Sequence, residues 1–159
     1  MFRKMRRFKQ ELDRQEIERI LLTNTAGVLS VIDEDGYPYA VPLSYVYSDG
    51  KIYFHSAKVG HKIDAIKNCD KATFCIIDKD EVQPEKYTTF YKSVIAFGTV
   101  KIIENQEETL SAIKELGEKY YPRHDTELQH EIDKSKDAFV IIRLDINHIT
   151  GKQARELCQ

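Results

Sequence analysis

Three short β-rich segments separated by glycine-containing turns constrain the fold of this chain more than any other feature. The segments cover residues 27–32, 37–47 and 51–56, and the turns between them are Asp33-Glu-Asp-Gly36 and Ser48-Asp49-Gly50. Glycine supplies the positive φ angle that tight hairpin turns require. Three short strands at this spacing are typical of an antiparallel meander.

Three more β-rich segments follow, at residues 71–78, 88–103 and 138–146. The polar segment 78–86 contains proline and is expected to be a loop, and Gly98 is expected to mark a bulge or a point of close packing. The chain therefore predicts about six antiparallel strands. A small barrel is favoured because closure removes exposed strand edges.

Four helices are expected around these strands. Asp13 and Glu16 have the spacing of a capping box, which predicts a helix that ends near Asn24. Helical spacing of apolar residues predicts the others, which cover residues 60–68, 104–121 and 126–136. The predicted fold class is mainly β with flanking helices.

Composition excludes several functional classes. The chain has 159 residues, is 42% apolar and carries a net charge of −2, so it lacks the basic field of a nucleic-acid-binding domain. Three cysteines without a CxxC motif predict neither a disulfide framework nor a thiolate zinc site. No apolar run is long enough for a membrane span, and no secretory signal is apparent. We expect a single soluble, cytoplasmic domain.

The first ten residues form a basic arm with five lysine or arginine side chains and no acidic residue. A solvated arm is the simpler interpretation, and an interaction tail is the alternative. Motifs of serine hydrolases, zinc proteases, P-loop proteins and dinucleotide-binding folds are absent. The five histidines do not have metal-ligand spacing, so no metal site is expected.

The segment after the third strand has the features of an anion site. His55 and Ser56 end the strand, a four-residue connection closes with Gly60, and a helix begins with His61 and Lys62. Helix N-termini offer unpaired N–H groups and a partial positive charge, and a lysine there adds a full charge. Gly60 allows close backbone approach. A serine near a helix start with a surface lysine is the alternative interpretation.

This segment resembles a known family. Two hairpin strands followed by F-H-S-x(3)-G-x-K are similar to the pyridoxamine 5'-phosphate oxidase-like FMN-binding split barrel. The runs GYPYAVPLSYVY, KIYFHSAKVGHKIDAIK and PEKYTTFYKSVIAFG resemble its nitroimidazole-resistance (5-nitroimidazole reductase-like) branch. The likeness covers about residues 5–155. It implies one six-stranded antiparallel split β-barrel domain over residues 1–159, with residues 1–10 as its arm, that binds FMN.

The resemblance also implies site residues. It places the FMN phosphate on Ser56, His61 and Lys62, beside Gly60. Backbone contacts to the isoalloxazine edge fall on Val41, Pro42 and Leu43. The family has a histidine near the flavin, which is His55 here. Residues near the cofactor that often come from a partner subunit fall on Tyr91, Lys92 and Ser93. Ordinary strand packing is the alternative for Tyr91, Lys92 and Ser93. Thr150-Gly151-Lys152, after the last predicted strand, also resembles a recurring ending of the family, and a local C-terminal turn is the alternative.

Two departures bear on the reaction. The oxidase branch has arginines where this chain has Ala40 and His61, which argues against true pyridoxamine 5'-phosphate oxidation. His55 is instead the candidate catalytic residue, because its near-neutral pKa suits proton delivery. Period-two alternation with Ile52 and Phe54 predicts that His55 lies on the outer side of its strand. A histidine packed in the barrel mouth is the alternative.

The expected function is an FMN-dependent oxidoreductase that reduces a small aromatic or nitro-aromatic acceptor, with NAD(P)H as electron donor. A non-catalytic flavin- or heme-binding protein, a pyridoxamine 5'-phosphate oxidase-like oxidase and a nucleic-acid partner that uses the basic arm are the alternatives. We expect a homodimer, because an apolar face of the second strand would otherwise be exposed. This face consists of Val41, Leu43, Tyr45 and Tyr47.

Overall fold

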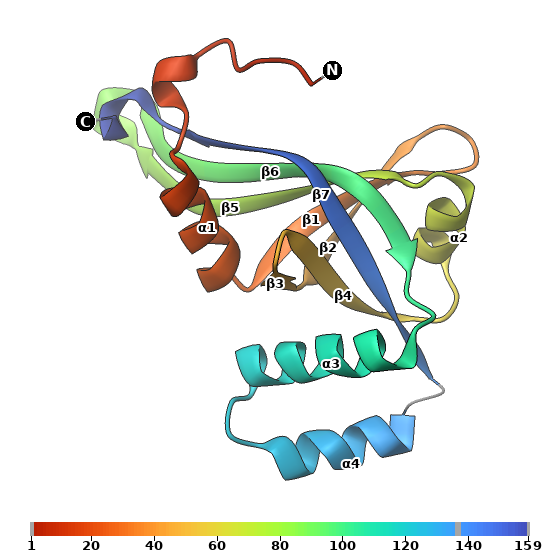
Figure 1. Cartoon of the computed structure of the whole chain (residues 1–159). Helices are drawn as coiled ribbons and strands as arrows, with labels where there is room; N and C mark the ends of the chain where they lie inside the picture. The colour runs from red at the N-terminus through yellow and green to blue at the C-terminus, as the bar shows by residue number, and fades with distance from the viewer. Residues whose placement is uncertain (1, 136–137, 159) are drawn as a thin grey trace.

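The computed structural model of the chain describes residues 2–135 and 138–158 (Figure 1). Within these ranges seven strands form one antiparallel sheet in the order β2-β1-β5-β6-β7-β4-β3. The strands are β1 (Ala26–Ile32), β2 (Pro38–Ser44), β3 (Val46–Ser48), β4 (Lys51–Ala57), β5 (Lys71–Gln83), β6 (Thr88–Ile102) and β7 (Phe139–Gln153).

The helices are α1 (Arg14–Thr23), α2 (His61–Asn68), α3 (Gln106–Tyr120) and α4 (Asp125–Ser135), with short 3-10 turns η1 (Phe8–Gln10), η2 (Pro84–Lys86) and η3 (Arg155–Leu157). They match the four predicted helices, apart from residue 136 of the predicted helix 126–136, which lies outside the described residues. The amide of Glu16 donates to Asp13 Oδ1 at 2.8 Å, so the predicted cap of α1 is present. In the described ranges no helix has the length and apolarity that a membrane crossing requires.

The predicted strand 37–47 is wrong in one respect, because it breaks at Tyr45. This side chain is fully buried and its hydroxyl donates to the carbonyl of Leu21 at 2.8 Å. Its backbone amide donates to the hydroxyl of Tyr120 at 2.8 Å instead of to a neighbouring strand. β2 therefore pairs with β1 and β3 with β4. The described sheet has seven strands rather than six, and its ladder ends at β2 and β3 instead of closing.

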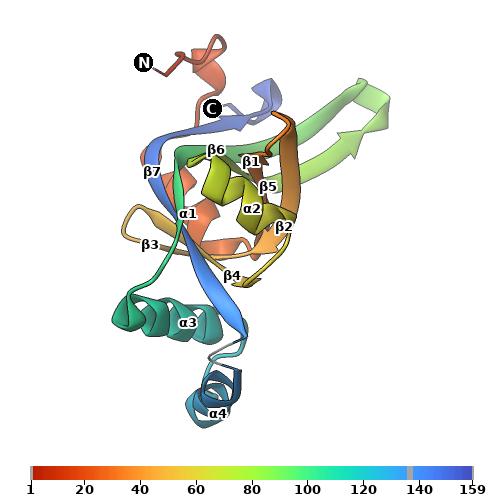
Figure 2. The same ribbon diagram turned by 90° about the vertical axis from the view of Figure 1, so that its right-hand side faces the viewer.

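The predicted loop 78–86 is also wrong. β5 continues to Gln83, and its last residues pair with the start of β6 from Thr88 onward. This part of the hairpin extends away from the rest of the sheet (Figure 2). Its side chains are exposed or half-buried and none is fully buried, so strand formation there does not require an apolar core. The polar composition reflects solvent exposure rather than a loop.

β7 is longer than the predicted strand, and the alternative of a local turn at Thr150-Gly151-Lys152 is wrong because these residues pair with β6. A Cβ on Gly151 would lie 2.7 Å from Ile17 Cγ1, so the glycine lets α1 pack against β7. The expected irregularity at Gly98 is confirmed. The β6–β7 register shifts there, and a Cβ on Gly98 would lie 2.2 Å from the carbonyl oxygen of Asp145.

Two apolar clusters hold the structure together. The larger lies between the curved sheet and helices α1 and α2, and includes Ile20, Phe54 and Phe74. The smaller joins α3 and α4 to the opposite side of β4 through Tyr53 and Ile113. The face of the second predicted strand that was expected to be exposed packs toward the larger cluster. The residues of this face are Val41, Leu43, Tyr45 and Tyr47.

Candidate functional site

The end of β4 presents His55 on the outer side of the sheet, as period-two alternation predicts. Ile52 and Phe54 are completely buried on the inner side, whereas His55 is exposed. The ring centroid of His55 lies 4.9 Å from that of Phe139, at the start of β7. Strand pairing between β4 and β7 creates this contact. Sequence reasoning did not find Phe139, because nothing local in the sequence indicates that pairing.

Ser56 lies on the inner side of β4. Its side chain is only 5% exposed, and its hydroxyl donates to the carbonyl of Ala57 at 3.1 Å. The hydroxyl and the His55 ring therefore leave opposite sides of the strand. A contact between Ser56 and a phosphate group stays a prediction.

The beginning of α2 lies three residues beyond β4. Gly60 is the N-cap with a φ of +127°, a conformation that favours glycine. It has no side chain to cap the helix, so the N–H groups of the first turn have no side-chain acceptor from the cap position. These groups and the helix dipole form an electropositive end.

Lys62 adds a full positive charge to this helix end. Its side chain is half-buried, and partial burial lowers its pKa. The pKa of His55 is lowered as well, first by partial burial of the ring and then by the charge of Lys62. The Lys62 ammonium group has no ion-pair partner among the described residues, and together with the helix end it suits an anionic group.

His61 has a different set of neighbours. Its Nε2 lies 3.5 Å from Asp33 Oδ2, and its ring stacks on Tyr39 with centroids 4.2 Å apart. The ring thus joins α2 to the turn between β1 and β2. Tyr39 and Asp33 were not singled out from the sequence. Their only signal is that both flank the conspicuous glycine turn.

β2 forms an edge of the sheet and lies beside α2 (Figure 2). The side chains of Val41 and Leu43 are half-buried against the larger cluster, whereas Pro42 is exposed. β1 pairs with one side of β2, and no described strand pairs with the other side. Unpaired backbone groups there can hydrogen-bond to the edge of a flat ligand.

Tyr91, Lys92 and Ser93 lie at the other end of the sheet. Lys92 is opposite Gln153 of β7, whereas His55 is opposite Ile141. Twelve residues of β7 separate the two positions, which is roughly 40 Å along an extended strand at about 3.3 Å per residue. One copy of the chain does not bring these predicted site residues together.

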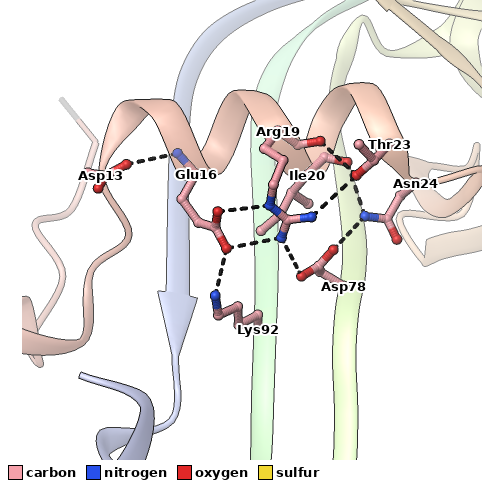
Figure 3. Close-up of polar contacts among 8 residues, drawn as sticks. All are labelled: Asp13, Glu16, Arg19, Ile20, Thr23, Asn24, Asp78 and Lys92. Carbon is pink, nitrogen blue, oxygen red and sulfur yellow. Dashed lines mark hydrogen bonds and ion pairs between the residues drawn. The ribbon is translucent and has the colours of Figure 1, made fainter. Parts of the chain in front are cut away.

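Lys92 belongs to an ion network that fastens α1 to β5 and β6 (Figure 3). Its ammonium group lies 2.6 Å from Glu16, and Glu16 and Asp78 both bind Arg19 at 2.8 Å. Asn24 also donates to Asp78. Hydrogen bonds from Arg19 and then Lys92 lower the pKa of Glu16 to about 2. A capping box predicts that the Glu16 carboxylate bonds to the backbone at the start of α1. In the structure this carboxylate binds Arg19 and Lys92.

The fold can now be compared with known proteins. The family model of pyridoxamine 5'-phosphate oxidase matches residues 13–153. The chain belongs to this family. None of the curated protein sequences compared with the chain matches it.

Solved structures agree with the family assignment at the level of the fold. A Bacteroides thetaiotaomicron protein named for 5-nitroimidazole antibiotic resistance is 23% identical, with a TM-score of 0.75 over 90% of this chain and 86% of its own. A conserved hypothetical protein from Mycobacterium tuberculosis is 19% identical, with a TM-score of 0.83 over 97% and 92%. A FAD- and heme-binding protein from Mycobacterium smegmatis is 20% identical, with a TM-score of 0.78 over 92% and 74%.

Proposed function

We propose that this member of the pyridoxamine 5'-phosphate oxidase family binds FMN and reduces a small aromatic or nitro-aromatic acceptor. The observation that carries the proposal is the start of α2 beside His55, where Lys62 has no ion-pair partner among the described residues. In this proposal the curved sheet is a split barrel, and the flavin lies where α2 meets the edge of β2.

The residues present fit the phosphate group of FMN. Lys62 would supply a charge-assisted hydrogen bond, and the first N–H groups of α2 would supply neutral ones. Ser56 can join them only if its hydroxyl leaves the carbonyl of Ala57. A single lysine and one helix end suit one phosphate group, which favours FMN over FAD. The unpaired edge of β2 at Val41, Pro42 and Leu43 would hold the flavin ring through its backbone.

FMN, when bound, supplies the electron and hydride chemistry. The chain positions the flavin and provides His55 as a proton donor on the outer side of β4. Partial burial and Lys62 both lower the pKa of His55. An anionic phosphate beside Lys62 would offset that charge and raise the pKa of His55 toward neutrality, so ligand binding would prepare the imidazole for proton delivery.

The placement of Tyr91, Lys92 and Ser93 supports a homodimer as part of this proposal. These residues can approach a flavin only if it belongs to a second copy, since about 40 Å of strand separates them from His55 in their own chain. The outer face of β5 and β6 suits such contact, because its apolar residues Ile77 and Ile95 are 63% and 36% exposed. A two-fold axis on this face would complete both sites.

A non-catalytic flavin or heme carrier is the second candidate, supported by the likeness to a FAD- and heme-binding protein from Mycobacterium smegmatis. Anaerobic addition of NAD(P)H followed by a nitro-aromatic acceptor separates the two. In an enzyme, NAD(P)H will bleach the flavin absorbance and the acceptor will restore it. A carrier will show no turnover of the acceptor.

The visible spectrum of the purified protein tests the cofactor proposal first. We expect a yellow sample that releases FMN rather than FAD on denaturation, at about one per chain. A colourless sample that also fails to bind added FMN would overturn the proposal. Light scattering tests the dimer, and an FMN-saturated monomer at micromolar concentration would contradict it.

A further inference from the structure

A hollow lies where the N-terminal arm meets the C-terminal 3-10 turn η3, far from His55 in the same chain. Both segments lie at the same corner of the molecule (Figure 1). The hollow has a volume of about 540 Å³, within the range of small-molecule sites. Its lining residues are Arg6, Arg7, Phe8, Lys9, Gln10, Arg155 and Cys158.

The charge of this hollow is strongly one-sided. Four of its seven lining residues are basic and none is acidic. In the part of the chain that the structure describes, none of these four cations forms an ion pair. Folding thus brings Arg155, from the opposite end of the sequence, to the basic arm. Unpaired cations that converge on one hollow indicate an anionic ligand.

Gln10 provides a second, independent indication. Its side chain is only 6% exposed, and Nε2 donates to the carbonyl of Gln153 at 3.1 Å. The other amide atom, Oε1, is buried without a hydrogen-bond donor among the described residues. Buried polar atoms are nearly always hydrogen-bonded, and Gln10 lines the hollow, so a ligand donor that reaches this acceptor from the hollow would satisfy it.

We propose that this hollow binds a small molecule with at least two negative charges and a hydrogen-bond donor, of which a nucleoside diphosphate is the simplest example. The cations would bind the phosphate groups, and Gln10 Oε1 would accept from an amine or hydroxyl group. Within one chain the hollow is distant from His55, since Gln153 lies twelve residues along β7 from the partner of His55. In the proposed homodimer the hollow would adjoin the flavin of the second copy, because Gln153 is opposite Lys92. The proposal rests on the hollow of one chain and does not require that dimer.

Charge distribution favours a small ligand over a nucleic acid. Without the first ten residues, the chain has 19 basic and 26 acidic side chains, a net charge of −7. A long polyanion would meet this negative surface beyond the hollow, whereas a small ligand would contact the hollow alone.

Calorimetric titration of the full chain with ADP tests the proposal. We expect a submillimolar Kd, weakened about tenfold or more by Arg155→Gln and by Arg7→Gln. Arg14→Gln is the matched control, because Arg14 is exposed on nearby α1 but does not line the hollow. This control and Lys62→Ala should leave the ADP affinity unchanged. The exposed arginines keep the test independent of folding defects.

Three results would overturn the proposal. The first is no heat of binding at millimolar ADP, and the second is an equal loss of ADP affinity in Arg14→Gln. The third is a loss of ADP affinity in Lys62→Ala alone, which would place ADP in the flavin site. Tighter binding of a single-stranded 20-mer than of ADP, with a steep salt dependence, would assign the basic arm to nucleic acid instead. Gln10→Met should weaken ADP binding severalfold at an unchanged melting temperature. Unchanged affinity would remove Gln10 from the site.

Discussion

Replacement of Lys62 by alanine separates phosphate binding from flavin-ring binding. Lys62 is half-buried in the first turn of α2, next to N–H groups that the N-cap Gly60 leaves without a side-chain acceptor. Alanine keeps the helix intact, since it has the highest helix propensity. The variant therefore removes the positive charge from the proposed phosphate site with little effect on the backbone around it.

The expected loss follows from the kind of contact. A hydrogen bond to a charged group contributes roughly 1.5–3 kcal/mol, so Lys62→Ala should weaken FMN binding by about 10- to 150-fold. Riboflavin lacks the phosphate, so its affinity should hardly change. Because partial burial lowers the pKa of Lys62, FMN affinity should also fall with rising pH before an ordinary lysine would titrate.

Flavin fluorescence titration of the apoprotein measures both affinities. Lys67→Ala is the matched control, because Lys67 is exposed in the last turn of the same helix. The control should bind FMN like the parent chain. Equal losses for FMN and riboflavin, or equal losses in the two variants, would refute the phosphate role of Lys62.

Three further predictions concern catalysis and stability. His55→Ala should keep FMN affinity within about tenfold and lower nitro-aromatic turnover by about 10²–10⁴; loss of FMN with unchanged turnover of the reconstituted protein would make His55 a binding residue. Glu16→Gln should lower the free energy of unfolding at pH 7 by about 1–2 kcal/mol, a value reduced because Arg19 is exposed to solvent. Because the pKa of Glu16 is lowered in the folded state, this difference should vanish in an acid titration as the pH falls from about 4.5 to 2. An unchanged acid profile would contradict the network. Gly98→Ala should lower the free energy of unfolding in urea by about 2 kcal/mol or more, because its Cβ would meet a backbone carbonyl. Gly36→Ala should lower it by about 1 kcal/mol, because Gly36 has a φ of +85° but open space around it. Equal losses would refute the close approach at Gly98.

Local patterns in the sequence were sufficient for most elements. Glycine turns, capping residues and apolar periodicity predicted the four helices and most strands, because each depends on neighbouring residues. They also predicted the outer position of His55 and the start of α2 at His61. The family resemblance, which rests on the runs at residues 36–47, 51–67 and 84–98, agrees with the match over residues 13–153.

Tertiary contacts decided the remaining features. The strand break at Tyr45 depends on the hydroxyl of Tyr120 from α3, and the polar end of β5 is a strand only because β6 pairs with it. The face of Val41 and Leu43 is partly buried by the chain's own core rather than left free for a partner. No local pattern contains these contacts, since their partners are distant in the sequence.

The same division applies to the two proposed sites. His55 and Lys62 of the proposed flavin site lie in one short segment, so strand and helix periodicity in the sequence was sufficient to place them. The hollow unites the first ten residues with Arg155 near the other end of the chain, and its buried Gln10 is held by the end of β7. The sequence shows only a basic arm, because the convergence of its charges requires the sheet that brings both termini together.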